Sequence, residues 1–168
     1  ADTSAAESTA ATADAAGAPD GDGDPTTLTV AMECAYAPYN WTQSDDSNGA
    51  VAIRGSSDYA YGYDVMMAKK IGEALGQQVQ IVKLDWDSLI PAVMSGDVDC
   101  VIAGQSITAE RAAQVDFSSP YYYASIVTLT KKDSAYANAA SVADLAGATA
   151  TSQLGTIWYD TCLPQIEN

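Results

Sequence analysis

The sequence predicts an open α/β sheet whose parallel strands alternate with helices. Three short segments are β-rich and apolar, and they lie at residues 28–32, 79–84 and 98–104. Between them, apolar residues recur every three or four positions, which is the period of an amphipathic helix. The order strand, helix, strand, helix, strand favours parallel neighbours joined by right-handed crossovers. In such sheets ligands bind beyond the carboxyl ends of the strands, so the loops after the three strands are the first candidates for a site.

The first strand is predicted at LTVAM, residues 28–32, which follows Pro25. The first helix is predicted to begin at Asp64 and to end at Gly76, because glycine is typical of helix C-termini. Its apolar residues are spaced by three and four and comprise Val65, Ala68, Ile71 and Leu75. This spacing gives the helix one apolar face to pack against a sheet.

The second strand is predicted at VQIVKL, residues 79–84, and a second helix follows it. Asp87 or Ser88 can cap that helix, and Pro91 falls near its first turn, where a missing N–H costs least. The third strand is predicted at VDCVIAG, residues 98–104, and is apolar enough to be buried.

Two further segments have distinct compositions. Residues 1–27 contain no aromatic and no large aliphatic residue, so they cannot bury enough apolar surface to offset the entropy of ordering, and we predict a disordered tether. A long polar loop runs from Glu33 to about Tyr61 and carries several tyrosines and a tryptophan. A loop of this length in a compact domain is usually functional or locally structured.

Composition excludes several classes of function. Asp and Glu number 22 against 7 Lys and Arg, for a net charge of −15, and such a surface repels nucleic-acid phosphates and anionic lipid. The sequence has no histidine, the commonest general base and metal ligand. Cys34, Cys100 and Cys162 lack the spacing of a metal site. We therefore expect no catalytic residue, no cofactor, no metal and no nucleic-acid partner.

The segment GQSITAER, residues 104–111, carries the clearest candidate site. Thr108 can cap a short helix through its hydroxyl and thereby place Arg111 in the first turn. A guanidinium beside the Ser106 and Thr108 hydroxyls can hold a carboxylate, because its fork of N–H groups matches the two carboxylate oxygens. The alternative is a surface ion pair of Arg111 with Glu110 or Asp116.

Several motifs together resemble the bacterial extracellular solute-binding proteins of family 3, the amino-acid-binding components of ABC importers. They stand in family order and comprise YAPYNW (36–41), GYDV (62–65), DWDSLIPAVMSGDVD (85–99), ITAER (107–111) and DFSSPYYY (116–123). SVADLAGATATSQLGT, residues 141–156, is similar to the segment that opens the second lobe in that family.

The resemblance implies a periplasmic-binding-protein-like fold of type II, in which a lobe with an open β-sheet flanked by helices is followed by the beginning of a second lobe. The first lobe would span residues 28–124, and a first hinge strand residues 125–133. Residues 134–168 would then start an incomplete second lobe, because relatives continue well beyond the position of Asn168.

The resemblance also implies roles for individual residues. Arg111 would bind the α-carboxylate of an amino acid with help from Ser106, and the Gly104 carbonyl would receive the α-ammonium together with Ser106. Tyr36 and Trp86 would wall the ligand side chain, although Trp86 could instead pack in the core and Tyr36 could lie on the loop surface.

Two more residues complete the implied site. Thr156, at the start of a predicted second-lobe helix, would add donors to the carboxylate. Glu33 follows the first strand, where relatives that bind cations often carry an acid, so it would face a lysine-, arginine- or ornithine-like head group. The alternative for Glu33 is a solvated loop carboxylate.

By this resemblance the protein would be an extracytoplasmic receptor that binds a polar or cationic L-amino acid between two lobes by hinge closure. It would act as a monomer, deliver its ligand to a membrane permease, and be lipid-anchored when complete, with its export signal outside this sequence. The alternatives are a periplasmic dehydratase-like enzyme, with Glu33 as a proton donor, and the ligand-binding domain of a sensor.

Overall fold

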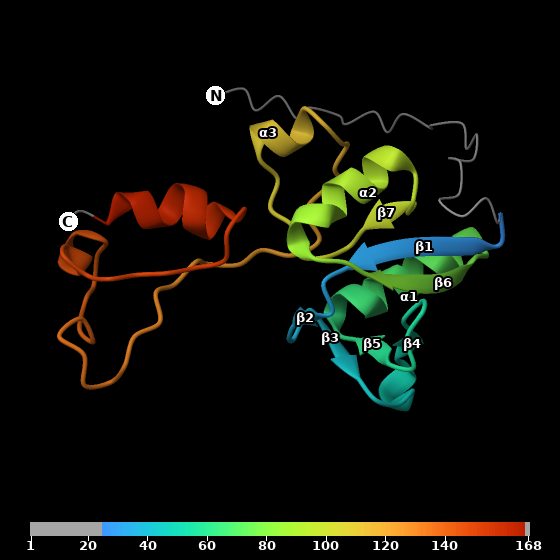
Figure 1. The fold of residues 1–168 in the computed structure, drawn as a ribbon, viewed down its shortest axis with the longest axis horizontal. Helices are drawn as coiled ribbons and strands as arrows, with labels where there is room; N and C mark the ends of the chain where they lie inside the picture. The colour runs from blue at the N-terminus through green and yellow to red at the C-terminus, as the bar shows by residue number, and fades with distance from the viewer. Residues whose placement is uncertain (1–24, 167–168) are drawn as a thin grey trace, which may run out of the picture.

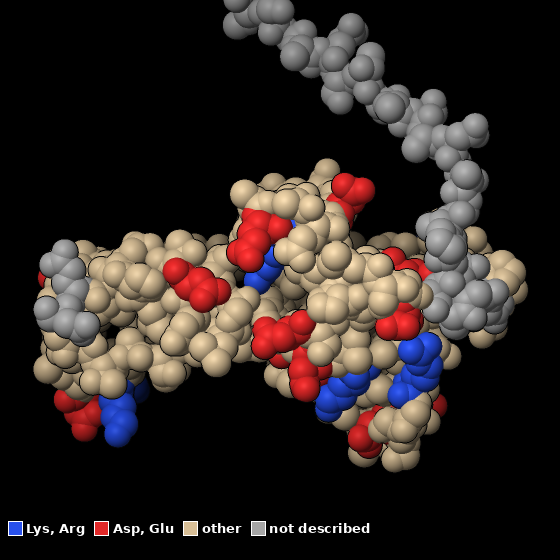
Figure 2. All heavy atoms as spheres, turned by 45° about the horizontal axis from the view of Figure 1, so that its top comes forward, with Lys and Arg blue, Asp and Glu red and all other residues tan. Residues whose placement is uncertain are grey.

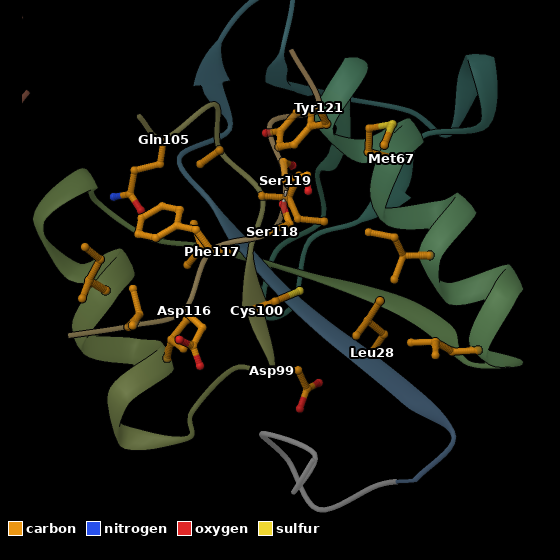
Figure 3. A pocket seen from close by; sticks show the side chains of 18 of the residues that line it. Leu28, Met67, Asp99, Cys100, Gln105, Asp116, Phe117, Ser118, Ser119 and Tyr121 are labelled. Atoms are coloured by element: carbon orange, nitrogen blue, oxygen red, sulfur yellow. Dashed lines mark hydrogen bonds between the residues drawn. The ribbon is translucent and has the colours of Figure 1, made fainter. Parts of the chain in front are cut away.

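The computed structural model describes residues 25–166 and confirms the predicted α/β architecture (Figure 1). Its central sheet has three parallel strands in the order β6 (Gln78–Lys83), β1 (Thr27–Met32) and β7 (Cys100–Val101). Helices α1 (Tyr63–Leu75) and α2 (Leu89–Ser95) lie on opposite sides of β1 (Figures 1 and 3). This arrangement is a parallel βαβαβ unit of the kind that the alternating pattern predicts.

Strand β1 is the centre of the core. Val30, Ala31 and Met32 have no exposed surface, because both faces of the strand are covered and both edges are paired. Its six residues pair in register with β6 from Thr27–Gln78 to Met32–Lys83. The absence of polar alternation in LTVAM therefore reflects burial on two faces. Since Thr27 already belongs to β1, only residues 1–24 of the predicted tether lie outside the described residues.

The first helix ends at a glycine in the left-handed conformation, as predicted, and the second helix ends in the same way. Gly76 ends α1 with φ 73°, and Gly96 ends α2 with φ 79°. The predicted cap of α2 is wrong, however, because Ser88 makes no side-chain capping hydrogen bond. A 3-10 turn, η2 (Trp86–Ser88), leads directly into α2, so Ser88 already has helical backbone angles in place of the extended ones of a capping residue.

The long loop before α1 is locally structured. It folds into a second, antiparallel sheet with strand order β2 (Ala35–Tyr36), β3 (Asn40–Gln43), β5 (Tyr59–Tyr61) and β4 (Val51–Ala52), and a 3-10 turn η1 (Ser47–Gly49) lies between β3 and β4. The rings of Trp41 and Tyr61 meet edge to face across β3 and β5, with centroids 5.2 Å apart. Several aromatic side chains of the loop thus pack on one another.

Two predicted strands are shorter or missing. The third strand pairs in register only over Cys100 and Val101, and single backbone hydrogen bonds from Asp99 to Thr29 and from Ile102 to Ala31 flank this pairing. Val98, Ile102 and Ala103 are buried as predicted. Within the described chain, residues 125–133 form no strand, contrary to prediction. No neighbouring strand pairs with this β-rich segment, and Val127 and Leu129 are largely exposed.

The rest of the chain is mostly irregular and leaves the α/β layer (Figure 1). Up to residue 166, its described part contains only short helical turns: α3 (Ala109–Ala112), η3 (Ala143–Leu145), η4 (Trp158–Cys162) and η5 (Leu163–Gln165). Among residues 25–166, no helix has the length and apolar character that crossing a membrane requires.

Gly62 should be the glycine most sensitive to substitution. It has φ 132°, and a Cβ there would lie 2.2 Å from the Tyr39 carbonyl oxygen. We expect Gly62→Ala to lower the free energy of unfolding by roughly 3 kcal/mol, since backbone at both positions must move. Gly76→Ala is the matched control, because no atom lies within 4 Å of the added Cβ, and it should cost about 1 kcal/mol. Chemical denaturation measures both, and equal losses would contradict the predicted close approach.

Candidate ligand-binding site

The loops after the three parallel strands meet in one cleft, as the sheet rule predicts. Glu33 follows β1, Trp86 follows β6, and Gly104 follows β7. The cleft is completed by residues of the loop after β7 and of the C-terminal segment, together with Tyr36: Ser106, Arg111, Gln153, Thr156, Ile157 and Trp158. Seven of the eight residues predicted for the site therefore line it.

Arg111 occupies the centre of the cleft in a fixed orientation. Its backbone N–H donates to the Thr108 hydroxyl (3.2 Å), which caps α3 as predicted. Its guanidinium donates from Nη1 to the Ser106 carbonyl (2.8 Å) and from Nη2 to the Gly155 carbonyl (2.9 Å). The guanidinium carbon also lies 5.4 Å from the ring centroid of Trp86, within cation–π range. Partial burial lowers the pKa of Arg111 from its usual value, but an arginine remains charged at any physiological pH.

Thr108 is the one predicted site residue that does not line the cleft. The Thr108 hydroxyl accepts the backbone N–H of Arg111 at the start of α3. Thr108 therefore acts on the site by holding the backbone of Arg111. The geometry also directs Arg111 towards two carbonyls and not towards Glu110 or Asp116, the partners of the alternative surface ion pair.

The C-terminal segment closes the opposite side of the cleft. The Gly155 carbonyl accepts a second hydrogen bond, from Trp86 Nε1 (2.9 Å), and Gln153 Nε2 donates to Glu33 Oε1 (2.9 Å). Thr156 is 3% exposed, and its hydroxyl donates to the Gln153 carbonyl (2.6 Å) and accepts from the Tyr159 N–H (3.3 Å). This hydroxyl therefore holds the turn before η4.

Sequence reasoning did not predict Gln153, Ile157 and Trp158 as site residues. Trp158 meets Tyr36 edge to face, with ring centroids 6.0 Å apart, and so forms part of the aromatic wall. All three residues lie within three positions of Thr156, which sequence reasoning did place in the site. Proximity to Thr156 in the sequence was the only available signal, because the contact of Gln153 with Glu33 joins residues 120 positions apart.

The cleft has a volume of about 20 Å³, which is room for about one water molecule. A larger hollow of about 860 Å³ lies beside β7 between α1 and α2, lined mainly by apolar side chains (Figure 3). We assign the site to the smaller cleft because it gathers a guanidinium, a carboxylate, backbone carbonyls and aromatic walls, the mixture that fixes the orientation of a small polar ligand.

Two classes of chemistry lack support in the described residues. Residues 25–166 contain no group of three or more His, Cys, Asp or Glu side chains that could hold a metal ion. Cys34 lies beside Glu33, but it is 2% exposed, and burial raises the pKa of its thiol to about 11. The thiol is therefore protonated at neutral pH and is a poor nucleophile.

A parallel α/β layer whose strand ends carry a charged, aromatic cleft defines a small-molecule-binding lobe. Comparison with known families gives a more specific assignment. Residues 28–146 match the family model of the bacterial extracellular solute-binding proteins, family 3, and the chain belongs to this family.

Among its relatives, the arginine-binding extracellular protein ArtP of Bacillus subtilis is 34% identical over 130 residues, which are 77% of this chain and 45% of that protein. The ABC transporter arginine-binding protein 1 of Escherichia coli is 37% identical over 79 residues, which are 47% of this chain and 32% of that protein. The chain thus spans less than half the length of these relatives.

A solved structure extends the similarity to the C-terminal segment. It is the ancestral amino-acid-binding protein AncCDT-1, described as a precursor of cyclohexadienyl dehydratase. The match has a TM-score of 0.67 and 34% sequence identity, and it covers 84% of this chain and 60% of that one. The fold of the described chain is therefore that of an amino-acid-binding protein.

The buried position of Cys34 predicts low thiol reactivity. A pKa raised from 9.0 to about 11 reduces the thiolate fraction at pH 8 roughly a hundredfold, because each unit is a factor of ten. We expect iodoacetamide to modify the half-buried Cys162 well before Cys34 in the folded protein, with the rates measured by mass spectrometry of peptides. The difference should vanish in denaturant, and equal rates in the folded protein would contradict the buried placement.

Proposed function

We propose that this chain is the ligand-binding part of an extracytoplasmic amino-acid receptor of an ABC importer, and that it binds a polar or cationic L-amino acid. The observation that carries the proposal is the position of Arg111 between the Ser106 and Gly155 carbonyls, stacked on Trp86. Glu33 provides an opposite charge within the same cleft. The names of the relatives as arginine-binding proteins support the ligand class.

An amino acid matches the polar groups of this cleft. Its α-carboxylate would take the Nη2 donor of Arg111 in place of the Gly155 carbonyl, because a charged acceptor binds a guanidinium more strongly than a neutral one. Its α-ammonium would be held by the Gly104 carbonyl and Ser106. Tyr36 and Trp86 would cover the ligand side chain, and Thr156 would add a donor from the C-terminal segment.

A cationic side chain is favoured by the charges of the cleft and of the molecule. Glu33 is half-buried and is held by the neutral amide of Gln153, so a cationic head group would find a carboxylate that has no ion pair there. The net charge of −15 would also attract a cation from solution. Figure 2 shows acidic side chains spread over the visible face, including near its centre.

Hinge closure is the mechanism that the geometry supports. In the described arrangement the cleft of about 20 Å³ is too small for any amino acid, so residues 153–158 must withdraw before a ligand can enter. They would then close over the ligand, and the closed state is stabilised only by contacts that the open state lacks. The division into a first lobe at 28–124, a hinge at 125–133 and a second lobe from 134 is part of this proposal.

The remaining parts of the proposal concern the surroundings of the protein. A receptor of this kind would deliver its ligand to a membrane permease and would act as a monomer outside the cytoplasm, lipid-anchored in its complete form. A dehydratase-like enzyme or a sensor domain on the same fold would differ from it in the fate of the bound ligand, so ligand identity is the first property to measure.

A thermal-shift screen of the twenty amino acids, ornithine and citrulline should identify a ligand. A compound that binds only the native state raises the melting temperature in proportion to the logarithm of its concentration. We expect a basic amino acid to give the largest shift, and Arg111→Ala to weaken binding by about 3 kcal/mol, roughly a hundredfold, because a charge-assisted pair is lost.

Arg54→Ala is the matched control, because Arg54 is exposed and its side chain donates a hydrogen bond to Gln80 (3.3 Å), outside the cleft. It should leave the shift unchanged. If no amino acid shifts the melting temperature of the wild-type protein, the receptor proposal is wrong.

Glu33→Gln should reveal selectivity for charge. We expect it to weaken binding of L-arginine by about 1.4 kcal/mol, or tenfold, and to leave binding of the neutral analogue L-citrulline within about twofold, because only the cation loses an ionic partner. Calorimetric titration measures both affinities. The control is Glu73→Gln, an exposed position on α1. An equal loss for both ligands would assign Glu33 a structural role.

A further inference from the structure

A buried polar network lies beneath the cleft, and its centre is Asp64. Asp64 and Asn40 have no exposed surface, and Asn40 Nδ2 donates to Asp64 Oδ2 (2.7 Å). The hydroxyl of Tyr121 donates to the other carboxylate oxygen, Oδ1 (3.0 Å). Burial raises the pKa of Asp64, while these two hydrogen bonds act in the opposite direction. None of the three residues lines the cleft.

The first arm of the network ends beside Glu33. The carbonyl oxygen of the Asn40 side chain accepts the backbone N–H of Cys34 (2.8 Å), in the turn that follows β1. Cys34 has φ 54°, a left-handed conformation that non-glycine residues rarely adopt. The carbonyl of Cys34 accepts from the Thr42 hydroxyl (2.9 Å), so both of its backbone polar groups are held. This turn determines where Glu33 and Tyr36 enter the cleft.

The second arm ends at Gly104. The Tyr121 hydroxyl accepts the backbone N–H of Gly104 (3.1 Å), and Gly104 also has left-handed angles, with φ 61°. A Cβ added at Gly104 would lie 3.5 Å from the ring of Tyr36, so the Tyr36 ring lies next to this turn. The Asp64 carboxylate is thus connected to the Cys34 turn through Asn40 and to the Gly104 turn through Tyr121.

We infer that Asp64, Asn40 and Tyr121 act as positioning residues, which fix the Cys34 and Gly104 turns at the separation that ligand binding requires. The inference rests on the proposed function of the cleft. Strand pairing alone does not fix these turns, because β1 ends at Met32 and β7 at Val101, before either turn begins. The network supplies the missing hydrogen bonds, and a buried network that satisfies its members holds its geometry rigidly.

The test is Tyr121→Phe, which removes only the hydroxyl that joins Gly104 to Asp64. The matched control is Tyr123→Phe, since Tyr123 is 83% exposed. Two properties are measured: amide hydrogen exchange of Gly104 and Cys34 in the free protein by NMR, and the dissociation constant for L-arginine by calorimetry below the melting transition. We expect Tyr121→Phe to speed exchange at Gly104 and to weaken binding, each by about tenfold, and the control to change neither by more than about twofold.

Each outcome decides the inference. Faster exchange at Gly104 with an unchanged dissociation constant would show that the network has only a structural role, and it would overturn the inference. No change in either property would also overturn the inference. If Tyr121→Phe does not fold, Asp64→Asn, which has the same shape, is measured in the same way and should give the same two effects. A wild-type protein that binds none of the screened amino acids would overturn the proposed function, and the inference with it.

Discussion

The complete enclosure of β1 is the constraint on which the rest of the structure depends. Its edges are paired to β6 and β7, its faces are covered by α1 and α2, and Val30, Ala31 and Met32 have no exposed surface. A parallel strand in this position fixes the direction of both neighbours, so all three strands end on the same side. The residues after them are therefore brought together by the sheet itself, and the cleft forms where backbone pairing stops.

The chemistry of the cleft follows from its position where the three parallel strands end. Beyond the last paired residues, backbone carbonyls and N–H groups no longer have strand partners, so side chains must bind them or a ligand can. Arg111 binds the Ser106 carbonyl in the loop after β7 and the Gly155 carbonyl of the C-terminal segment. Tyr121 and Asn40 bind the N–H groups of Gly104 and Cys34. Glu33 and the aromatic rings complete a cleft with a cation, an anion and apolar walls.

Periodicity and helix-ending glycines were sufficient to predict the parallel sheet, and motif resemblance was sufficient to predict most of the cleft. The predictions that failed concern features decided by distant neighbours. Ser88 is suited to capping by residue type, but a preceding 3-10 turn places it within helical geometry. The segment 125–133 has β-rich composition, but composition does not supply a pairing partner. The contact of Gln153 with Glu33 spans 120 residues and has no local signature.

The Gly155 carbonyl accepts two hydrogen bonds, and this affects which anions can bind to Arg111. In the described state Arg111 and Trp86 both donate to this one oxygen, so the cationic centre of the cleft already has an acceptor. Chloride or acetate gains little by displacing it, because neither can also replace the contacts that residues 153–158 make with Glu33 and Trp86. A compound that engages Arg111, Glu33 and the aromatic walls together recovers that loss. The Gly155 carbonyl thus acts as an internal competitor, which any ligand of Arg111 must displace.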